Sequence, residues 1–268
     1  METIILLTGC IRPNGMSFTM LTDANDRQEQ YVHAIRYYLK ETNCKIIFCE
    51  NSNTDISTLF ETDRNKERLE FLTFCGNQDK QRGKGYGEAE IIEYALHHST
   101  FIQDDCCITK ITGRLIINNI RPIVDSFKHK YDFVTCLFHS DLKFSDSRIF
   151  CATPPFYREL LNNKSMINDN EEVFFEHVLC FSVLNSSIRY IPFTEEPMIT
   201  GISGTTGESY VAQQTDIKHQ LRYKCYSLTQ QLEINKRKHH WRYNIYNICQ
   251  DVLTQINIWK YKLLLKGK

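Results

Sequence analysis

Two acidic clusters carry the side chains best suited to proton transfer. Glu176 lies among phenylalanines in the run Glu171–His177, and Glu172 would share a helix face with it. Burial beside aromatic rings raises the pKa of a carboxyl, so Glu176 is suited to accept a proton from a hydroxyl group. Asp146, in the polar run Ser145–Arg148, is the second candidate base. The alternatives are an acidic first turn of a helix for Glu176 and a turn cap for Asp146.

A run of glycines and cations, Gln81–Gly87, precedes an expected helix over Gly87–His98. Glycines let backbone amides approach an anion closely, and the amino end of a helix adds partial positive charge. Lys84 is therefore a candidate phosphate ligand. The run has neither P-loop spacing nor the dinucleotide fingerprint, so a solvated basic turn is the alternative.

Two further cations, Lys110 and Arg114, flank Gly113 at the end of an expected apolar strand over Cys106–Ile111. Burying a cation costs free energy unless an anion meets it. The pattern predicts that both side chains face an anionic ligand at the end of this strand. The alternative is a structural ion pair with the acidic dipeptide Asp104–Asp105.

The elements that must position these residues alternate between strand and helix along the chain. Such alternation predicts an α/β fold with a mostly parallel sheet flanked by helices. Ligands of such sheets bind beyond the carboxyl ends of the strands. The apolar patterns predict strands at Ile4–Leu7, Lys45–Cys49, Leu69–Phe74, Cys106–Ile111, Tyr131–Phe138 and Arg189–Phe193, and helices at Asp26–Lys40, Gly87–His98, Phe156–Leu161 and Glu171–Leu184.

Polar residues follow the first two strands, where ligands of a parallel sheet bind. They are Thr8, Arg12, Glu50 and Asn51. Because the carboxyl ends of parallel strands meet at one edge, we expect these residues to share a site with the cations.

The later part of the chain changes character. The segment Thr200–Gly207, which contains Ser203 and Gly204, has three glycines and no periodicity, so we expect a mobile loop. We expect one domain over residues 1–210 and a helical, basic and aromatic extension over residues 211–268.

Composition excludes several classes of protein. The 268 residues, 42% of them hydrophobic, are enough for one large core, and 32 basic residues balance 32 acidic ones. No global field attracts nucleic acid, and we expect no such partner. Eleven cysteines without a C-x-x-C pair indicate reduced thiols. With no expected signal peptide or apolar run of about 18 residues, a cytoplasmic location is predicted.

The order of these features over residues 1–210 resembles the GT-A-type glycosyltransferases, in particular bacterial enzymes of capsule and lipopolysaccharide synthesis. The resemblance implies a GT-A-like, Rossmann-like fold that transfers a sugar from a nucleotide-sugar donor to a saccharide or lipid-linked saccharide acceptor. It implies that Thr200–Gly207 is a lid over the donor. It assigns base roles to Glu176 and Asp146, and donor binding to Thr8, Arg12, Glu50, Asn51, Lys84, Lys110, Gly113, Arg114, Ser203 and Gly204.

The chain departs from this family at its metal-binding motif. The strand that would end in Asp-x-Asp ends in Lys110–Arg114, and Asp104–Asp105 precede it. We therefore expect that Lys110 and Arg114 stabilise the leaving diphosphate, and that no cofactor is required. A divalent metal is the disfavoured alternative.

The C-terminal extension is basic and aromatic. This tail would contact the inner face of the cytoplasmic membrane, or else form a packed helix pair.

A sugar nucleotidyltransferase is the nearest alternative function, but it would carry Gly-x-Gly-x-Arg where Thr8–Arg12 has one glycine. A non-catalytic nucleotide-sugar-binding protein is the third possibility.

Overall fold

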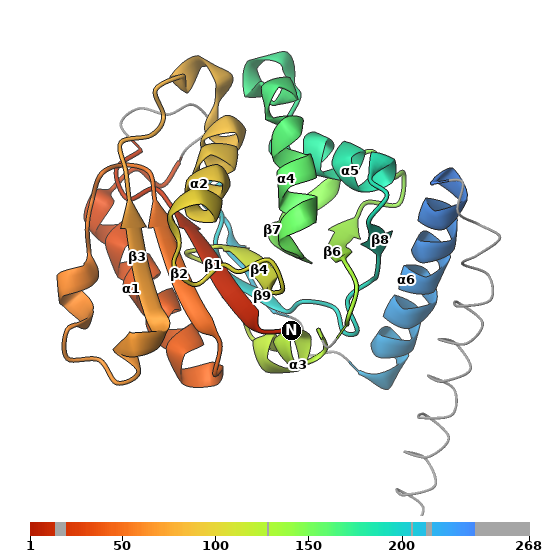
Figure 1. Ribbon diagram of the computed structural model, residues 1–268, viewed down its shortest axis with the longest axis horizontal. Coiled ribbons are helices and arrows are strands. Elements are labelled where there is room, and N and C mark those ends of the chain that lie inside the picture. The colour runs from red at the N-terminus through yellow and green to blue at the C-terminus, as the bar shows by residue number, and fades with distance from the viewer. Residues whose placement is uncertain (14–19, 128, 205, 213–215, 239–268) are drawn as a thin grey trace, which may run out of the picture.

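A seven-stranded sheet forms the centre of the protein (Figure 1). The computed structural model describes residues 1–13, 20–127, 129–204, 206–212 and 216–238. The strand order is β3-β2-β1-β4-β7-β6-β8, and only β7 runs antiparallel to its neighbours β4 and β6. The predicted α/β fold with a mostly parallel sheet is confirmed. The strands are β1 (Thr3–Gly9), β2 (Lys45–Glu50), β3 (Leu69–Thr73), β4 (Cys107–Thr112), β6 (Phe133–Phe138), β7 (Ser145–Ala152) and β8 (Arg189–Tyr190).

Helices cover both faces of this sheet (Figure 1). Side chains alternate across a strand, so Ile4 and Leu6 of β1 pack on one face and Ile5 and Leu7 on the other. All four are fully buried, as expected for a central strand that is covered on both sides. The first face packs against α2 (Lys84–His98), α4 (Pro154–Asn162) and α5 (Phe175–Asn185), and the second against α1 (Ala24–Glu41) and α3 (Ile120–Asp125).

A smaller sheet, in the order β10-β9-β5, lies beside the carboxyl end of β4. It corrects the predicted mobile loop at Thr200–Gly207, because residues 200–202 belong to a strand. Thr200 pairs with Ile116, a residue more than 80 positions earlier in the chain, and Gly201 and Ile202 pair with Tyr210 and Ser209. Local glycine content does not reveal such a partner. The strands are β5 (Ile116–Ile117), β9 (Ile199–Ile202) and β10 (Ser209–Tyr210).

The predicted elements differ from the observed ones at their ends, and two of these differences affect the interpretation. The helix expected from Glu171 begins at Phe175, because Glu172 adopts a left-handed backbone conformation with φ of 60°. Glu172 and Glu176 therefore do not share a helix face. The strand expected at Arg189–Phe193 ends at Tyr190. Short 3-10 turns occupy Ser57–Phe60, Lys66–Arg68, Lys80–Arg82, Lys164–Met166 and Asp169–Glu171.

The last described element is α6 (Ile217–Arg237), which packs beside β8. Asp216 caps it by accepting a 2.7 Å hydrogen bond from the backbone N–H of His219, and Ile234 is fully buried. The helical pattern is thus confirmed as far as Arg237. Most of the basic, aromatic tail that carries the predicted membrane contact falls on residues 239–268, outside the described residues. That contact and the division at residue 210 stay predictions. No helix in the described part of the chain is long and apolar enough to cross a membrane.

Candidate functional site

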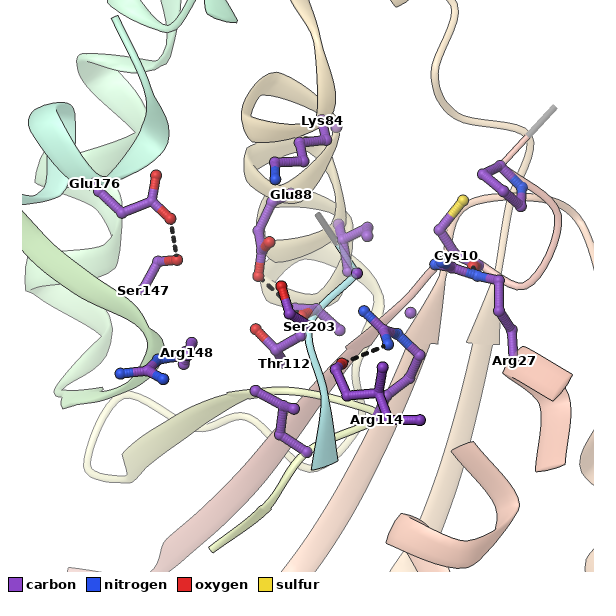
Figure 2. A pocket seen from close by; sticks show the side chains of 18 of the residues that line it. Cys10, Arg27, Lys84, Glu88, Thr112, Arg114, Ser147, Arg148, Glu176 and Ser203 are labelled. Carbon is purple, nitrogen blue, oxygen red and sulfur yellow. Dashed lines mark hydrogen bonds between the residues drawn. The ribbon is translucent and has the colours of Figure 1, made fainter. Parts of the chain in front are cut away.

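A cavity of about 390 Å³ opens at the carboxyl ends of β1, β2 and β4 (Figure 2). Residues from α2, β7, α5 and the β9–β10 hairpin complete its wall. Ligands of parallel sheets bind at this edge. The predicted site residues that line the cavity are Thr8, Asn51, Lys84, Arg114, Asp146, Glu176, Ser203 and Gly204, whereas Arg12, Glu50, Lys110 and Gly113 do not line it.

Glu176 lies in the first turn of α5 and its carboxyl faces the cavity (Figure 2). The hydroxyl of Ser147 donates a 2.6 Å hydrogen bond to its Oε1 atom. Burial raises the pKa of Glu176, the nearby Glu88 raises it further, and the Ser147 hydrogen bond partly offsets both. A carboxyl with a raised pKa is a stronger proton acceptor once it ionises, which suits Glu176 to general-base chemistry.

Asp146 is held in a different way. It lies within β7, two residues before Arg148 and on the same strand face. Arg148 donates to both carboxylate oxygens, with Nη2 at 2.6 Å from Oδ2 and Nε at 2.9 Å from Oδ1. The Arg148 guanidinium also lies over the ring of Tyr210, 4.7 Å from its centroid. This bidentate ion pair engages both carboxylate oxygens of Asp146, whereas Glu176 accepts from Ser147 through Oε1.

Lys110 differs most from its prediction. Its side chain is fully buried, its ammonium pairs with the carboxylate of Glu88 on α2, and it donates to the backbone oxygen of Ser147 at 2.7 Å. We expected direct contact with a leaving diphosphate, and the structure corrects this because Glu88 is the anion that Lys110 meets. The alternative partner Asp104 was also wrong, since Asp104 pairs with Arg158 at 2.6 Å.

Arg114 lies in the cavity wall and is 8% exposed. Its Nη1 donates to Oε1 of Gln30 at 3.2 Å and to the backbone oxygen of Ile202 at 3.1 Å. Its buried Nε has no partner among the described atoms. Gly204 permits the close approach of the hairpin, because a Cβ there would lie 2.4 Å from Nη2 of Arg114. Arg114 thus joins the hairpin to the end of β4 and retains donor capacity.

The amino end of α2 already holds an anion. Oδ2 of Asp169 accepts a 3.1 Å hydrogen bond from the backbone N–H of Gly85. A Cβ at Gly83 or Gly85 would lie 2.4 or 2.8 Å from Asp169, so the glycines make room for this carboxylate. Burial raises the pKa of Asp169. This corrects the predicted phosphate loop: the helix terminus binds a side chain of its own chain, although Lys84 lines the cavity.

Glu50 and Gly113 shape the strand ends instead of lining the cavity. A Cβ at Gly113 would lie 2.7 Å from the backbone oxygen of Thr8, which explains the glycine. Arg12 is exposed outside the cavity. Glu50 is fully buried, and its carboxylate accepts from three backbone N–H groups, those of Ile11, Ser52 and Thr54, at 2.9, 2.8 and 2.9 Å.

Several polar residues of the wall were not among the predicted site residues, and four of them are Arg27, Asn77, Glu88 and Arg148. Arg27 donates to the backbone oxygen of Cys10 at 2.7 Å and supports the loop after β1. Nδ2 of Asn51 donates to Oδ1 of Asn77 at 3.0 Å, joining the ends of β2 and β3. Two of the four carried a signal. Glu88 follows Lys84 by one helical turn and so faces the same way, and Arg148 ends the polar run that contains Asp146.

The end of β4 does not suit a divalent cation. Thr112, Gly113 and Arg114 follow one another there, and the guanidinium of Arg114 repels a metal ion. Within the described ranges, no three His, Cys, Asp or Glu side chains gather closely enough to hold a metal.

Comparisons with known proteins give only distant likenesses. No protein-family model and no curated protein matches the sequence. The glycosyltransferase GlyE of Streptococcus pneumoniae TIGR4 superposes with a TM-score of 0.44 at 10% identity, over 72% of this chain and 45% of GlyE. This chain therefore spans less than half of GlyE.

Two shorter proteins are similar over a larger share of their own length. HddC from Yersinia pseudotuberculosis gives a TM-score of 0.37 at 12% identity, over 75% of this chain and 93% of HddC. The 4-diphosphocytidyl-2C-methyl-D-erythritol synthase of Anaerococcus prevotii DSM 20548 gives a TM-score of 0.38 at 8% identity, over 84% of this chain and 99% of the synthase. TM-scores below 0.5 carry no argument about function, which must come from the site itself.

Proposed function

We propose that this chain is a glycosyltransferase that moves a sugar from a nucleotide-sugar donor to a saccharide acceptor. The observation that carries the proposal is that Glu176 and Arg114 both line the same cavity. Glu176 is a half-buried carboxyl with a raised pKa, and Arg114 is a cation in the cavity wall whose Nε has no partner among the described atoms. Figure 2 shows them on opposite sides of Glu88. Sugar transfer requires a base at the acceptor and positive charge at the leaving group.

The chemistry follows from this arrangement. The nucleotide would lie along the ends of β1, β2 and β4, with its diphosphate toward Arg114. Glu176 takes the proton of an acceptor hydroxyl while that oxygen forms a bond to the anomeric carbon. The bond between the anomeric carbon and the diphosphate oxygen breaks, and the electron pair leaves with the diphosphate. Arg114 stabilises the negative charge that develops there.

The biological setting is a further part of the proposal. The resemblance over residues 1–210 supports a role in bacterial surface polysaccharide synthesis, with a lipid-linked saccharide as acceptor. Peripheral contact of the basic, aromatic tail of the C-terminal extension with the inner membrane would bring the cavity close to such an acceptor. Flotation with anionic liposomes, comparing the full chain with a chain ending at Lys238, tests the contact: equal flotation contradicts it.

Ligand screening tests the activity. UDP-, GDP-, CMP- and TDP-sugars are compared for thermal stabilisation of the protein and for slow hydrolysis. We expect one nucleotide series to raise the unfolding temperature and to release its nucleotide, which is a nucleoside diphosphate for UDP-, GDP- and TDP-sugars and CMP for CMP-sugars. If no nucleotide sugar does either, the proposed function is wrong.

The competing functions predict other products. A sugar nucleotidyltransferase would join a sugar 1-phosphate to a nucleoside triphosphate and release pyrophosphate. A binding protein would be stabilised by a nucleotide sugar without turnover, and Glu176→Gln would leave its function intact.

A further inference from the structure

We infer that Glu88 is the residue that recognises the transferred sugar, and that Lys110 positions it. The inference rests on the proposed function and deepens it, because it assigns the sugar's hydroxyl groups to a specific carboxylate. Glu88 lies in α2 one helical turn after Lys84, and both side chains line the cavity. Its side chain is 24% exposed, so a ligand in the cavity can reach it.

The contacts of Glu88 with described residues involve its Oε1 atom and not its Oε2 atom. Oε1 accepts a 3.0 Å hydrogen bond from the hydroxyl of Thr8 and pairs with the ammonium of Lys110. For Oε2, the described residues supply no hydrogen-bond donor. An ionised carboxylate has about four acceptor positions and no donor, so Glu88 offers acceptors to the cavity. Sugar hydroxyls are the donors that a nucleotide sugar would bring.

Lys110 explains why this carboxylate stays in place. A fully buried ammonium is stable only with its charge paired and its protons bonded. The ammonium contacts Glu88, the backbone oxygen of Ser147 at 2.7 Å and the hydroxyl of Thr112 at 3.4 Å. Three contacts account for its three protons, so none is left for a ligand. Lys110 therefore acts through Glu88 and is a positioning residue.

The place of Glu88 in the cavity matches the place of the sugar. Figure 2 shows its carboxylate between Glu176 on one side and Arg114 on the other. In the proposed reaction the anomeric carbon lies between the base and the diphosphate. The ring attached to that carbon must then face Glu88, whose free oxygen can accept hydrogen bonds from its hydroxyls. Hydrogen bonds to a charged acceptor are stronger than neutral ones.

The experiment separates sugar recognition from nucleotide binding. Titration calorimetry compares UDP with UDP-glucose, and GDP with GDP-mannose, on the wild type and on Glu88→Gln. We expect Glu88→Gln to weaken binding of the nucleotide sugar by roughly 10- to 100-fold and to leave the nucleoside diphosphate within about twofold. Glu93→Gln, on the same helix but outside the cavity and paired with Lys164, is the matched control.

Further variants guard against a folding defect. Glu88→Asp retains the charge beside Lys110 but withdraws it by one methylene, and we expect the same selective loss for the nucleotide sugar. Lys110→Met in the Glu88→Gln background should cause no additional selective loss, because its effect runs through Glu88. If wild type, Glu88→Gln and Glu88→Asp bind the nucleotide sugar with the same affinity, and likewise the nucleoside diphosphate, the inference is overturned while the proposed function stands. If the wild type binds nucleoside diphosphates but no nucleotide sugar, both fall.

Discussion

Ser147 donates its hydroxyl to Glu176 at 2.6 Å, and its backbone oxygen accepts from the ammonium of Lys110 at 2.7 Å. One residue of β7 therefore links the half-buried carboxyl of Glu176 on α5 to the ion pair between β4 and α2. The proposed base and the proposed sugar-binding carboxylate are held against the same strand. Movement of β7 would change both positions together, which ties the chemistry to the packing of the sheet.

Replacing the base should abolish turnover but not binding. Glu176→Gln retains the shape of the side chain and an acceptor for Ser147, yet it cannot take a proton. We expect a fall in turnover of roughly 100- to 10,000-fold with donor affinity within about threefold. Steady-state kinetics with the donor found by screening provides the measurement, and Glu171→Gln, at an exposed carboxyl outside the cavity, is the control. Turnover retained in Glu176→Gln would assign the base role elsewhere.

The raised pKa of Glu176 makes stability depend on pH. Its folded pKa lies above the ordinary value of 4.5, so the folded chain holds this proton to higher pH than the unfolded chain does. The contribution of Glu176 to the free energy of unfolding is therefore present at low pH and is lost as the pH rises through the folded pKa. We expect urea unfolding to show Glu176→Gln gaining stability relative to wild type between pH 4 and pH 8. A constant difference over that range contradicts the burial effect.

The cap on α2 gives a prediction about stability alone. Gly83 has φ of 86° and ψ of −177°, a region that essentially only glycine adopts, and a Cβ there would meet Asp169. Gly83→Ala should lower the free energy of unfolding by about 2–4 kcal/mol, since backbone strain and steric overlap add. Gly207→Ala is the control, because its φ is 74° but no atom lies within 4 Å. Equal losses would mean that Asp169 contributes nothing.

Arg114 provides the test of charge stabilisation at the diphosphate. We expect Arg114→Gln to lower turnover roughly 100-fold, because the positive charge acts on the leaving group. Arg121→Gln, at a guanidinium outside the cavity 4.0 Å from Glu41, should have no effect. Wild-type turnover should persist unchanged in excess chelator. If turnover is lost in chelator and restored by manganese, a metal ion and not Arg114 stabilises the charge on the diphosphate.

Several elements of the fold can be predicted from the pattern of apolar residues within a single segment. Ile4–Leu7 and Lys45–Cys49 are short apolar runs, and they form the buried strands β1 and β2 as predicted, because burial on both faces leaves that pattern. The helix before Lys110 and the strand around it were predicted as well. Periodicity within a segment suffices for such elements.

Contacts between distant segments could not be predicted in the same way. Asp169 reaches Gly85 across 84 residues, and Lys110 finds Glu88 and not the neighbouring Asp104. A glycine beside a cation has the same appearance whether it makes room for a phosphate or for a carboxylate of the same chain. Only the three-dimensional partner distinguishes the two, and for Gly83 and Gly85 that partner is Asp169.

The central claim is sugar transfer with Glu176 as the base. The most direct measurement is mass spectrometry of saccharide acceptors incubated with the stabilising nucleotide sugar and either wild type or Glu176→Gln. The account predicts an acceptor heavier by one sugar residue with the wild type, together with an equal amount of free nucleoside diphosphate, and neither product with Glu176→Gln. Pyrophosphate formation from a nucleoside triphosphate, or equal transfer by both proteins, would contradict it.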